Sequence, residues 1–186
     1  CQQLCRGELR EVEARYRLDL TEREYFEIIR DKTASLIGGC CRSGAYLGGA
    51  TPETVERLAA FGVSFGLAFQ IIDDCLDLTG DPRELGKSVL ADLDNGALSL
   101  PMIYLAQVLP RRQREQLFAP LREGATDRAV LGRIAQAARS RGALAQARSR
   151  AAALLETALE SLAGVPMNGL AGAYRQLAAY AMTRRS

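Results

Sequence analysis

Three aspartates, Asp73, Asp74 and Asp77, lie within five positions of one another at the end of an apolar segment. If this stretch is helical, residues three and four apart share a face, so the three carboxylates project from neighbouring positions. Crowded like charges are unfavourable at a buried surface unless a cation neutralises them. A hard divalent ion is one such cation, and magnesium commonly takes one or two protein carboxylates plus substrate phosphates. The alternative is a solvated helix end that is merely acidic.

The segment before these aspartates is among the most apolar of the chain. Residues 58–72 carry no charge, and Gln70 is one of two polar side chains in that run. We expect a buried core helix and no transmembrane segment, because the run is too short to span a bilayer and ends in aspartates. As a polar side chain stranded in an apolar helix, Gln70 is a candidate site residue.

Other polar residues in apolar surroundings are Lys32, Thr33, Lys87 and Asp92. With the aspartates they suit a metal-bound diphosphate, because carboxylates bind the cation while lysines and a hydroxyl suit the anionic oxygens. Each residue alone is a weak signal: Lys32 with Thr33 is typical of a surface pair, and Lys87 of a loop. Arg184, near the end of the chain, is interpreted as part of a solvated end, although it could contact a phosphate.

The segment that carries Lys32 and Thr33 is predicted to be helical. Thr21 followed by Glu24 forms a capping-box pattern, which indicates a helix start. The apolar face of that helix should turn Tyr25 inward, with Lys32 and Thr33 close to the same face. This helix would therefore bring the lysine and the hydroxyl towards the core.

Residues 38–49 contain five glycines, which normally disfavour a helix. Because no Pro, Asn or Asp occurs among them, we interpret the segment as a helix packed tightly against a neighbour. Thr51 and Pro52 then predict the start of a long helix that runs to the aspartates. In that helix Gly62 and Gly66 are four apart, which suits close packing.

Downstream of the aspartates, a break is expected at residues 79–82, and Leu100 with Pro101 begins another helix. No strand-like alternation occurs anywhere, so the predicted class is all-α, with a single helical domain over residues 1–186. Beyond residue 110 we expect further helices at 111–119, 126–141, 143–163 and 167–184.

The composition is that of an ordinary globular protein: of 186 residues, 48% are hydrophobic and 25% are charged. Five cysteines, an odd number without a preceding secretory signal, indicate reduced thiols and a cytoplasmic location. A zinc site is disfavoured because the chain has no histidine. The chain begins at Cys1 within a predicted helix, so we interpret it as the C-terminal part of a longer protein.

The motifs occur in a specific order along the chain. The sequence FQIIDDCLD at residues 69–77 is accompanied by shorter motifs at residues 7–8, 25–26, 31–34, 45–50, 80–82, 85–87, 92–93 and 98–101, and more faintly at 177–181. Together they resemble the trans-isoprenyl diphosphate synthases, the polyprenyl synthetase family, with residues 69–77 as the second aspartate-rich region. The resemblance covers essentially the whole chain.

This resemblance implies an isoprenoid-synthase-type helical bundle and a prenyltransferase activity. In that family three magnesium ions assist the ionisation of an allylic diphosphate, isopentenyl diphosphate attacks the allylic cation, and loss of a proton leaves a chain five carbons longer. The implied cofactor is Mg²⁺, with Mn²⁺ as a substitute, and the implied partners are the two diphosphates. A homodimer is implied as well, and no nucleic-acid partner is expected.

The resemblance also assigns roles by position. Asp73 would be the main metal ligand, with Asp74 and Asp77 binding metal directly or through water. Neutralising the charge of a departing diphosphate is work in which metals and lysines contribute most. Lys32 and Lys87 would hold the allylic diphosphate, and Thr33 and Gln70 would line the reaction centre beside it. The implied catalytic residues are Lys32, Thr33, Gln70 and Asp73.

The sequence departs from the family pattern in three places and lacks one part of it. Ala97 replaces a lysine that would contact diphosphate, Ser99 replaces a threonine, and Leu90 replaces a loop glycine. The first aspartate-rich motif and the basic residues that bind isopentenyl diphosphate are absent from this chain. We therefore expect an incomplete bundle with half of an active site, inactive by itself.

Two alternatives to an active synthase remain. One is a non-catalytic or regulatory subunit of a heteromeric prenyl diphosphate synthase, which Ala97 and the pair Cys1 and Cys5 favour and the intact DDxxD motif opposes. The other is a plain helical structural domain with an acidic helix end, which the ordered motifs oppose.

Overall fold

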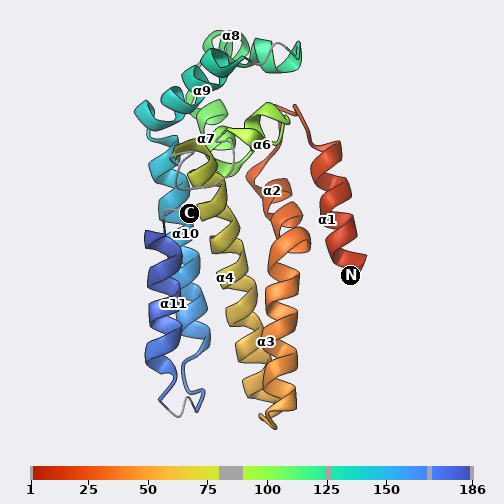
Figure 1. Ribbon diagram of the computed structural model, residues 1–186, viewed down its shortest axis with the longest axis vertical. Coiled ribbons are helices and arrows are strands. Elements are labelled where there is room, and N and C mark those ends of the chain that lie inside the picture. Colours follow the sequence, from red (N-terminus) through yellow and green to blue (C-terminus); the bar gives the residue numbers. More distant parts are fainter. Residues whose placement is uncertain (1, 80–89, 125–126, 167–168, 185–186) are drawn as a thin grey trace.

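The computed structural model describes residues 2–79, 90–124, 127–166 and 169–184. This part of the chain is built from helices joined by turns, and it contains no strand (Figure 1). The all-α prediction is therefore confirmed. In chain order the elements are α1 (Gln2–Glu13), α2 (Glu22–Ile29), the π-helical turn η1 (Arg30–Ala34), α3 (Ser35–Leu47), α4 (Pro52–Thr79), α6 (Ala91–Asp94), α7 (Leu100–Val108), α8 (Arg111–Arg122), α9 (Arg128–Ser140), α10 (Ala143–Ser161) and α11 (Ala171–Thr183).

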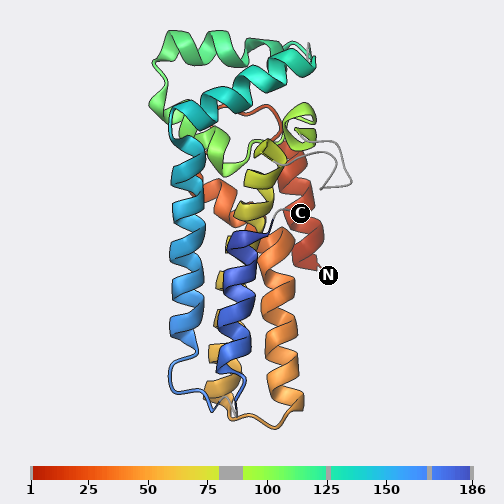
Figure 2. The same ribbon diagram turned by 60° about the vertical axis from the view of Figure 1, so that its left-hand side comes forward.

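The 28-residue helix α4 is the centre of the bundle, and it packs mainly against α3 and α10 (Figures 1 and 2). By length and composition it could cross a membrane, since its most apolar 18-residue window has a mean hydropathy of 1.4. However, 56% of that window is buried inside the protein. A helix that is apolar on most faces needs such covering neighbours. The apolar run 58–72 thus lies in a core helix that continues through all three aspartates.

The close contact between α3 and α4 depends on glycine. A Cβ atom on Gly62 would lie 2.8 Å from the Gly38 Cα atom and 2.9 Å from the Ile37 carbonyl oxygen. A Cβ atom on Gly66 would lie 2.7 Å from the Ala34 Cα atom. These distances are shorter than non-bonded carbon atoms tolerate, so the two backbones can approach only at glycine. The prediction of tight packing is confirmed at these positions.

Within residues 38–49, tight packing also occurs at Gly38, where a Cβ atom would lie 2.6 Å from Val63 Cγ2, but the prediction is wrong for the remaining glycines. Gly39 and Gly44 lie in α3, but a Cβ atom on either would meet no described atom within 4 Å. Helix α3 ends at Leu47, and Gly48 and Gly49 form the turn before α4. Gly49 has a φ of +74°, a conformation that glycine adopts without steric cost.

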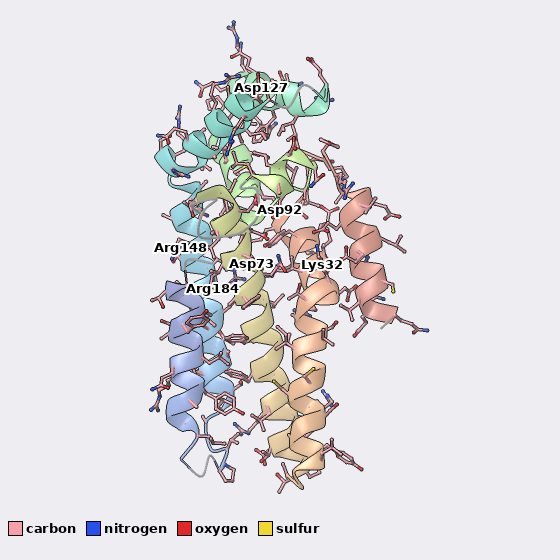
Figure 3. The ribbon with its side chains drawn as sticks, in the orientation of Figure 1. Lys32, Asp73, Asp92, Asp127, Arg148 and Arg184 are labelled. Atoms are coloured by element: carbon pink, nitrogen blue, oxygen red, sulfur yellow. The ribbon has the colours of Figure 1, made fainter. Side chains whose placement is uncertain are left out.

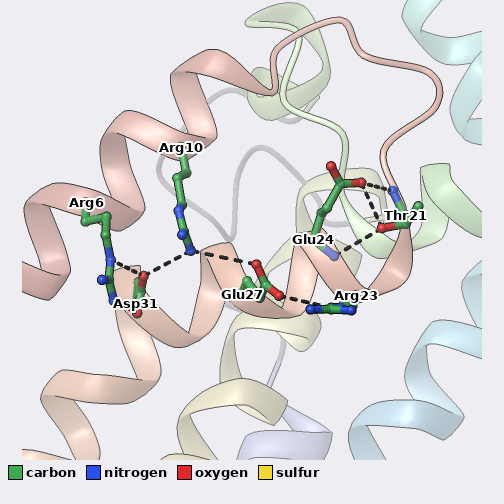
Figure 4. Close-up of polar contacts among 7 residues, drawn as sticks. All are labelled: Arg6, Arg10, Thr21, Arg23, Glu24, Glu27 and Asp31. Atoms are coloured by element: carbon green, nitrogen blue, oxygen red, sulfur yellow. Dashed lines mark hydrogen bonds and ion pairs between the residues drawn. The ribbon is translucent and has the colours of Figure 1, made fainter.

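The predicted capping box is present at the start of α2 (Figure 4). The Glu24 N–H donates to Thr21 Oγ1 at 3.2 Å, and the Thr21 N–H donates to Glu24 Oε2 at 2.9 Å. The hydrogen bonds from Thr21, with help from Arg17, lower the pKa of Glu24 to about 2. This cap sets where α2 begins and therefore the register of the turn that follows it.

The remaining helices complete the bundle and close one end of it. Helices α10 and α11 run alongside α4, whereas α6 to α9 gather at the end where α4 finishes (Figures 1 and 2). Helix α7 begins at Leu100 with a proline in its first turn, as predicted, and is buried over most of its length. The four helices that follow begin and end within about one turn of the predicted bounds.

Candidate active site

A cavity of about 50 Å³ lies between α1, α2, η1, α4 and the segment after α6. It has room for a few water molecules but not for a prenyl diphosphate. The structure brings Lys32, Gln70, Asp74 and Asp92 together around it, four residues that the sequence singled out from distant positions. The other polar residues of its lining are Glu11, Tyr25 and Ser99.

A chain of hydrogen bonds crosses the wall of this cavity. Thr33 Oγ1 donates to Gln70 Oε1 at 2.8 Å, and Gln70 Nε2 donates to Asp74 Oδ1 at 2.9 Å. The Tyr25 hydroxyl donates to the other oxygen, Asp74 Oδ2, at 2.6 Å. Tyr25 was expected only as an apolar core residue, and its polar role was missed. The available signal was that a buried tyrosine hydroxyl usually needs a partner.

Asp74 is buried and electrostatically unusual. Burial raises its pKa to about 7, and the carboxylates of Asp92 and Asp73 push in the same direction. The hydrogen bonds from Tyr25 and Gln70 oppose this rise without cancelling it. A carboxyl group in such surroundings binds either a proton or another cation near neutral pH, which is typical of functional sites.

The raised pKa of Asp74 predicts a pH dependence of stability in metal-free buffer. Because the folded protein holds this proton up to about pH 7 and the unfolded chain releases it near 3.8, the folded state binds more protons in between. The free energy of unfolding should therefore decrease as the pH rises from about 4 to 7. Urea unfolding at pH 4.5, 6 and 7.5 would measure this slope. Asp74→Asn should be less pH-dependent than the wild type, and an equal slope would contradict the prediction.

Asp73 lies on the same helix but faces α11 instead of the cavity. Its Oδ1 atom is 2.6 Å from Arg184 Nη2, and Figure 3 shows the two side chains next to each other. The interpretation of Arg184 as a solvated end is therefore wrong, since only 8% of its side chain is exposed. The exposed fraction of the Asp73 side chain is 37%, so this carboxylate also remains open to solvent.

Asp77 is buried and bonds to the start of α6. Its two carboxylate oxygens accept hydrogen bonds from the backbone N–H groups of Ala91 at 3.2 Å and Asp92 at 3.3 Å. The three carboxylates thus have neighbouring positions on α4 but different partners. Within the described ranges, no group of three or more His, Cys, Asp or Glu side chains is arranged to hold a metal ion.

Lys32 and Thr33 lie on η1, a π-helical turn that was predicted as ordinary α-helix. Such turns insert one extra residue into a helix and often occur at functional sites. Lys32 Nζ is 2.6 Å from Glu11 Oε2 and 3.7 Å from Glu8 Oε1. Burial lowers the pKa of Lys32, but the contact with Glu11 outweighs this, so the pKa is raised and the lysine stays charged.

Helix α1 holds this turn in place. Asp31 is buried and accepts two hydrogen bonds from Arg6, at 2.8 and 3.1 Å, while Arg10 lies 3.4 Å away (Figure 4). A Cβ atom on Gly7 would lie 2.4 Å from the backbone nitrogen of Lys32, so only glycine lets α1 come this close. The position of Lys32 therefore depends on packing between α1 and η1 and on a partly buried ion pair.

Two of the three departures from the family pattern lie at the cavity. Ala97 and Ser99 both line it, so a longer side chain at position 97 would face Lys32 and Asp74. Leu90 has a φ of +67°, which costs a branched residue roughly 1–2 kcal/mol and explains a preference for glycine there. Lys87 lies outside the described residues, as does the break predicted after Thr79.

The sequence of this chain is similar to those of known prenyl diphosphate synthases. The polyprenyl synthetase family matches over residues 1–138. The chain is 37% identical over 178 residues to heptaprenyl diphosphate synthase component 2 of Geobacillus stearothermophilus, covering 96% of this chain and 54% of that protein. It is 38% identical over 124 residues to a short chain isoprenyl diphosphate synthase of Methanothermobacter thermautotrophicus, covering 67% of this chain and 38% of that protein.

Solved structures show the same fold. A polyprenyl synthase from Caulobacter crescentus, crystallised in complex with calcium and isoprenyl diphosphate, superposes with a TM-score of 0.94 at 30% identity, over 100% of this chain and 56% of that one. A decaprenyl diphosphate synthase from Rhodobacter capsulatus superposes with a TM-score of 0.90 at 29% identity, over 100% and 57%. The chain spans about half the length of these relatives. It is an all-α protein with the isoprenoid synthase fold, and it belongs to the polyprenyl synthetase family.

Proposed function

We propose that this chain is the C-terminal part of a prenyl diphosphate synthase, which condenses an allylic diphosphate with isopentenyl diphosphate. The observation that carries the proposal is the meeting of a charged lysine, Lys32, with Gln70, Asp74 and Asp92 at one cavity. A cation beside clustered carboxylates suits a diphosphate bound together with a metal ion. Family membership supports this assignment. So does the structural similarity to the Caulobacter crescentus polyprenyl synthase, which was crystallised with isoprenyl diphosphate.

Two adjacent carboxylates together with substrate phosphates are the usual donors for Mg²⁺, so we propose Mg²⁺ as the cofactor, with Mn²⁺ as a substitute. Burial is the main reason why the pKa of Asp74 is raised, and the carboxylates of Asp92 and Asp73 add to the rise, so a bound cation would be favourable there. Asp73 and Asp74 would hold the metal directly. Asp77 already accepts two backbone hydrogen bonds, so it would act through bound water. When bound, the metal neutralises the charge of the departing diphosphate.

The protein groups around the metal would bind and orient the allylic substrate. Lys32 would exchange its contact with Glu11 for a diphosphate oxygen, and Lys87 would supply a second positive charge. The bonded pair Thr33 and Gln70 would fix the polar edge of the reaction centre. The apolar faces of α2 and α4 would exclude water from the carbocation, which water would otherwise capture.

We further propose that the chain is one part of a single larger helical domain, in a cytoplasmic homodimer. The second candidate function is a subunit of a heteromeric synthase. It is favoured by the 37% identity to a protein named component 2 of a heptaprenyl diphosphate synthase. Ala97, which removes a diphosphate contact that the family pattern includes, also favours it.

The decisive experiment is an elongation assay on the full-length protein. With Mg²⁺, geranyl or farnesyl diphosphate and labelled isopentenyl diphosphate, we expect elongated prenyl diphosphates. The chain of residues 1–186 alone should yield none, because its relatives are about twice as long. Activity that appears only after a second protein is added would support the heteromeric candidate. Product formed by residues 1–186 alone would contradict the half-site interpretation.

A further inference from the structure

Arg184 forms an ion pair with Asp73 of α4. It is the first residue after α11, where the backbone leaves the helix with φ −58° and ψ 148°. Its Nη2 atom is 2.6 Å from Asp73 Oδ1 and also donates to the Phe69 carbonyl oxygen at 3.1 Å. The guanidinium group lies 3.8 Å from the centre of the Phe69 ring. Charge-assisted hydrogen bonds of a buried arginine are stronger than those of exposed pairs.

Two features weaken the hold on Arg184. The Arg184 Nε atom is buried without a hydrogen-bond partner among the described residues, which is unfavourable for a donor removed from water. Helix α11 also has few fully buried residues, Ala178 and Ala181, whereas Leu177 and Tyr180 are 43% and 62% exposed. Its other anchors are the partly buried Tyr174 and Met182 and the hydrogen bond from Arg148 to the Met182 carbonyl oxygen. Segments with few buried apolar contacts open at low free-energy cost. The unpartnered Nε atom and the small buried face of α11 lower the cost of releasing Arg184 from Asp73.

We propose that Arg184 is the resting-state counter-ion of Asp73 and competes with a divalent cation for this carboxylate. The inference rests on the proposed metal-binding role of Asp73. A guanidinium group 2.6 Å from Asp73 Oδ1 would repel a metal ion bound to the same carboxylate, so the two cations weaken each other's binding. Arg184 at the end of α11 thus competes with metal for Asp73, and metal binding releases its side chain.

The test measures binding of Mn²⁺ alone to the full chain by electron paramagnetic resonance or calorimetry. Arg184→Ala and Arg184→Gln should bind Mn²⁺ about tenfold more tightly than the wild type, because the competing charge is gone. Arg175→Ala is the matched control, an exposed arginine on the same helix, and should bind like the wild type. Hydrogen exchange gives a second readout: Mg²⁺ should accelerate exchange in the last turn of α11 in the wild type but not in the Arg184 variants.

Asp73→Asn separates this inference from the proposed function. If this variant loses Mn²⁺ binding and the Arg184 variants bind more tightly, both proposals are supported. If Asp73→Asn loses binding but the Arg184 variants bind equally or more weakly, the counter-ion proposal is overturned while the metal site stands. If Asp73→Asn binds Mn²⁺ like the wild type, the metal site itself is wrong, and the counter-ion proposal falls with it.

Discussion

Replacing Asp73 by Ala in the full-length protein should lower kcat by about a thousandfold, which corresponds to roughly 4 kcal/mol of lost transition-state stabilisation. The reason is that this carboxylate is the proposed main ligand of the metal that neutralises the departing diphosphate. The fold should survive, because Asp73 is 37% exposed and its partner Arg184 lies near the end of the described chain. Turnover with saturating substrates, followed by labelled product, would measure the effect.

The matched control for this substitution is Asp94→Ala. Asp94 is also an aspartate on a helix near the cavity, but it is exposed on α6. Its removal should change kcat by less than about twofold, while circular dichroism should report equal helix content for both variants. An Asp73→Ala protein with wild-type turnover would overturn the assignment of residues 73–77 as a metal-binding motif.

Replacing Gly62 by Ala should destabilise the chain by about 3 kcal/mol, at the upper end of typical overpacking effects. The added methyl group would lie 2.8 Å from the Gly38 Cα atom and 2.9 Å from the Ile37 carbonyl oxygen. Backbone atoms cannot rotate away as a side chain can, so α3 would have to separate from α4. Because η1 continues directly into α3, Thr33 would shift away from Gln70 as well. Urea unfolding at fixed pH would measure the loss.

Gly44→Ala is the control, and it should change the free energy of unfolding in the opposite direction. Gly44 lies within α3, and a Cβ atom there would meet no described atom within 4 Å. Alanine should therefore stabilise the chain by roughly 0.5–1 kcal/mol through its higher helix propensity. Stability of the Gly62→Ala protein at or above the wild-type value would show that the helices are not in the tight contact described.

Much of the fold could be predicted from the sequence because its signals are local. The capping box of Thr21 and Glu24, and the proline after Leu100, mark helix starts through groups only a few residues apart. The π-helical turn η1 could not be predicted in this way. It depends on how α1 packs against residues 30–34, through Gly7 and the pair of Arg6 with Asp31.

The candidate site was predicted only in part, because its contacts also depend on packing between segments that are distant in the sequence. Residue types and motif order indicated Lys32, Gln70 and Asp74, which the structure brings to one cavity. Tyr25 and Arg184 were missed as polar partners, and Leu90 was recognised as a departure without its cause. The left-handed conformation of Leu90 depends on the path of the backbone, which a substitution in the sequence does not reveal.

The sequence by itself determined the helical class, the family and the chemical character of the acidic motif, because helix periodicity and motif spacing relate residues close in the chain. Only the tertiary structure decided what each carboxylate contacts. Asp74 bonds to a tyrosine 49 positions away, Asp73 to an arginine 111 positions away, and Asp77 to backbone groups 14 and 15 positions away. Helical spacing sets the direction in which a side chain leaves its helix. The partner that it meets depends on which distant segment packs there, and therefore on the balance of burial and charge over the whole bundle.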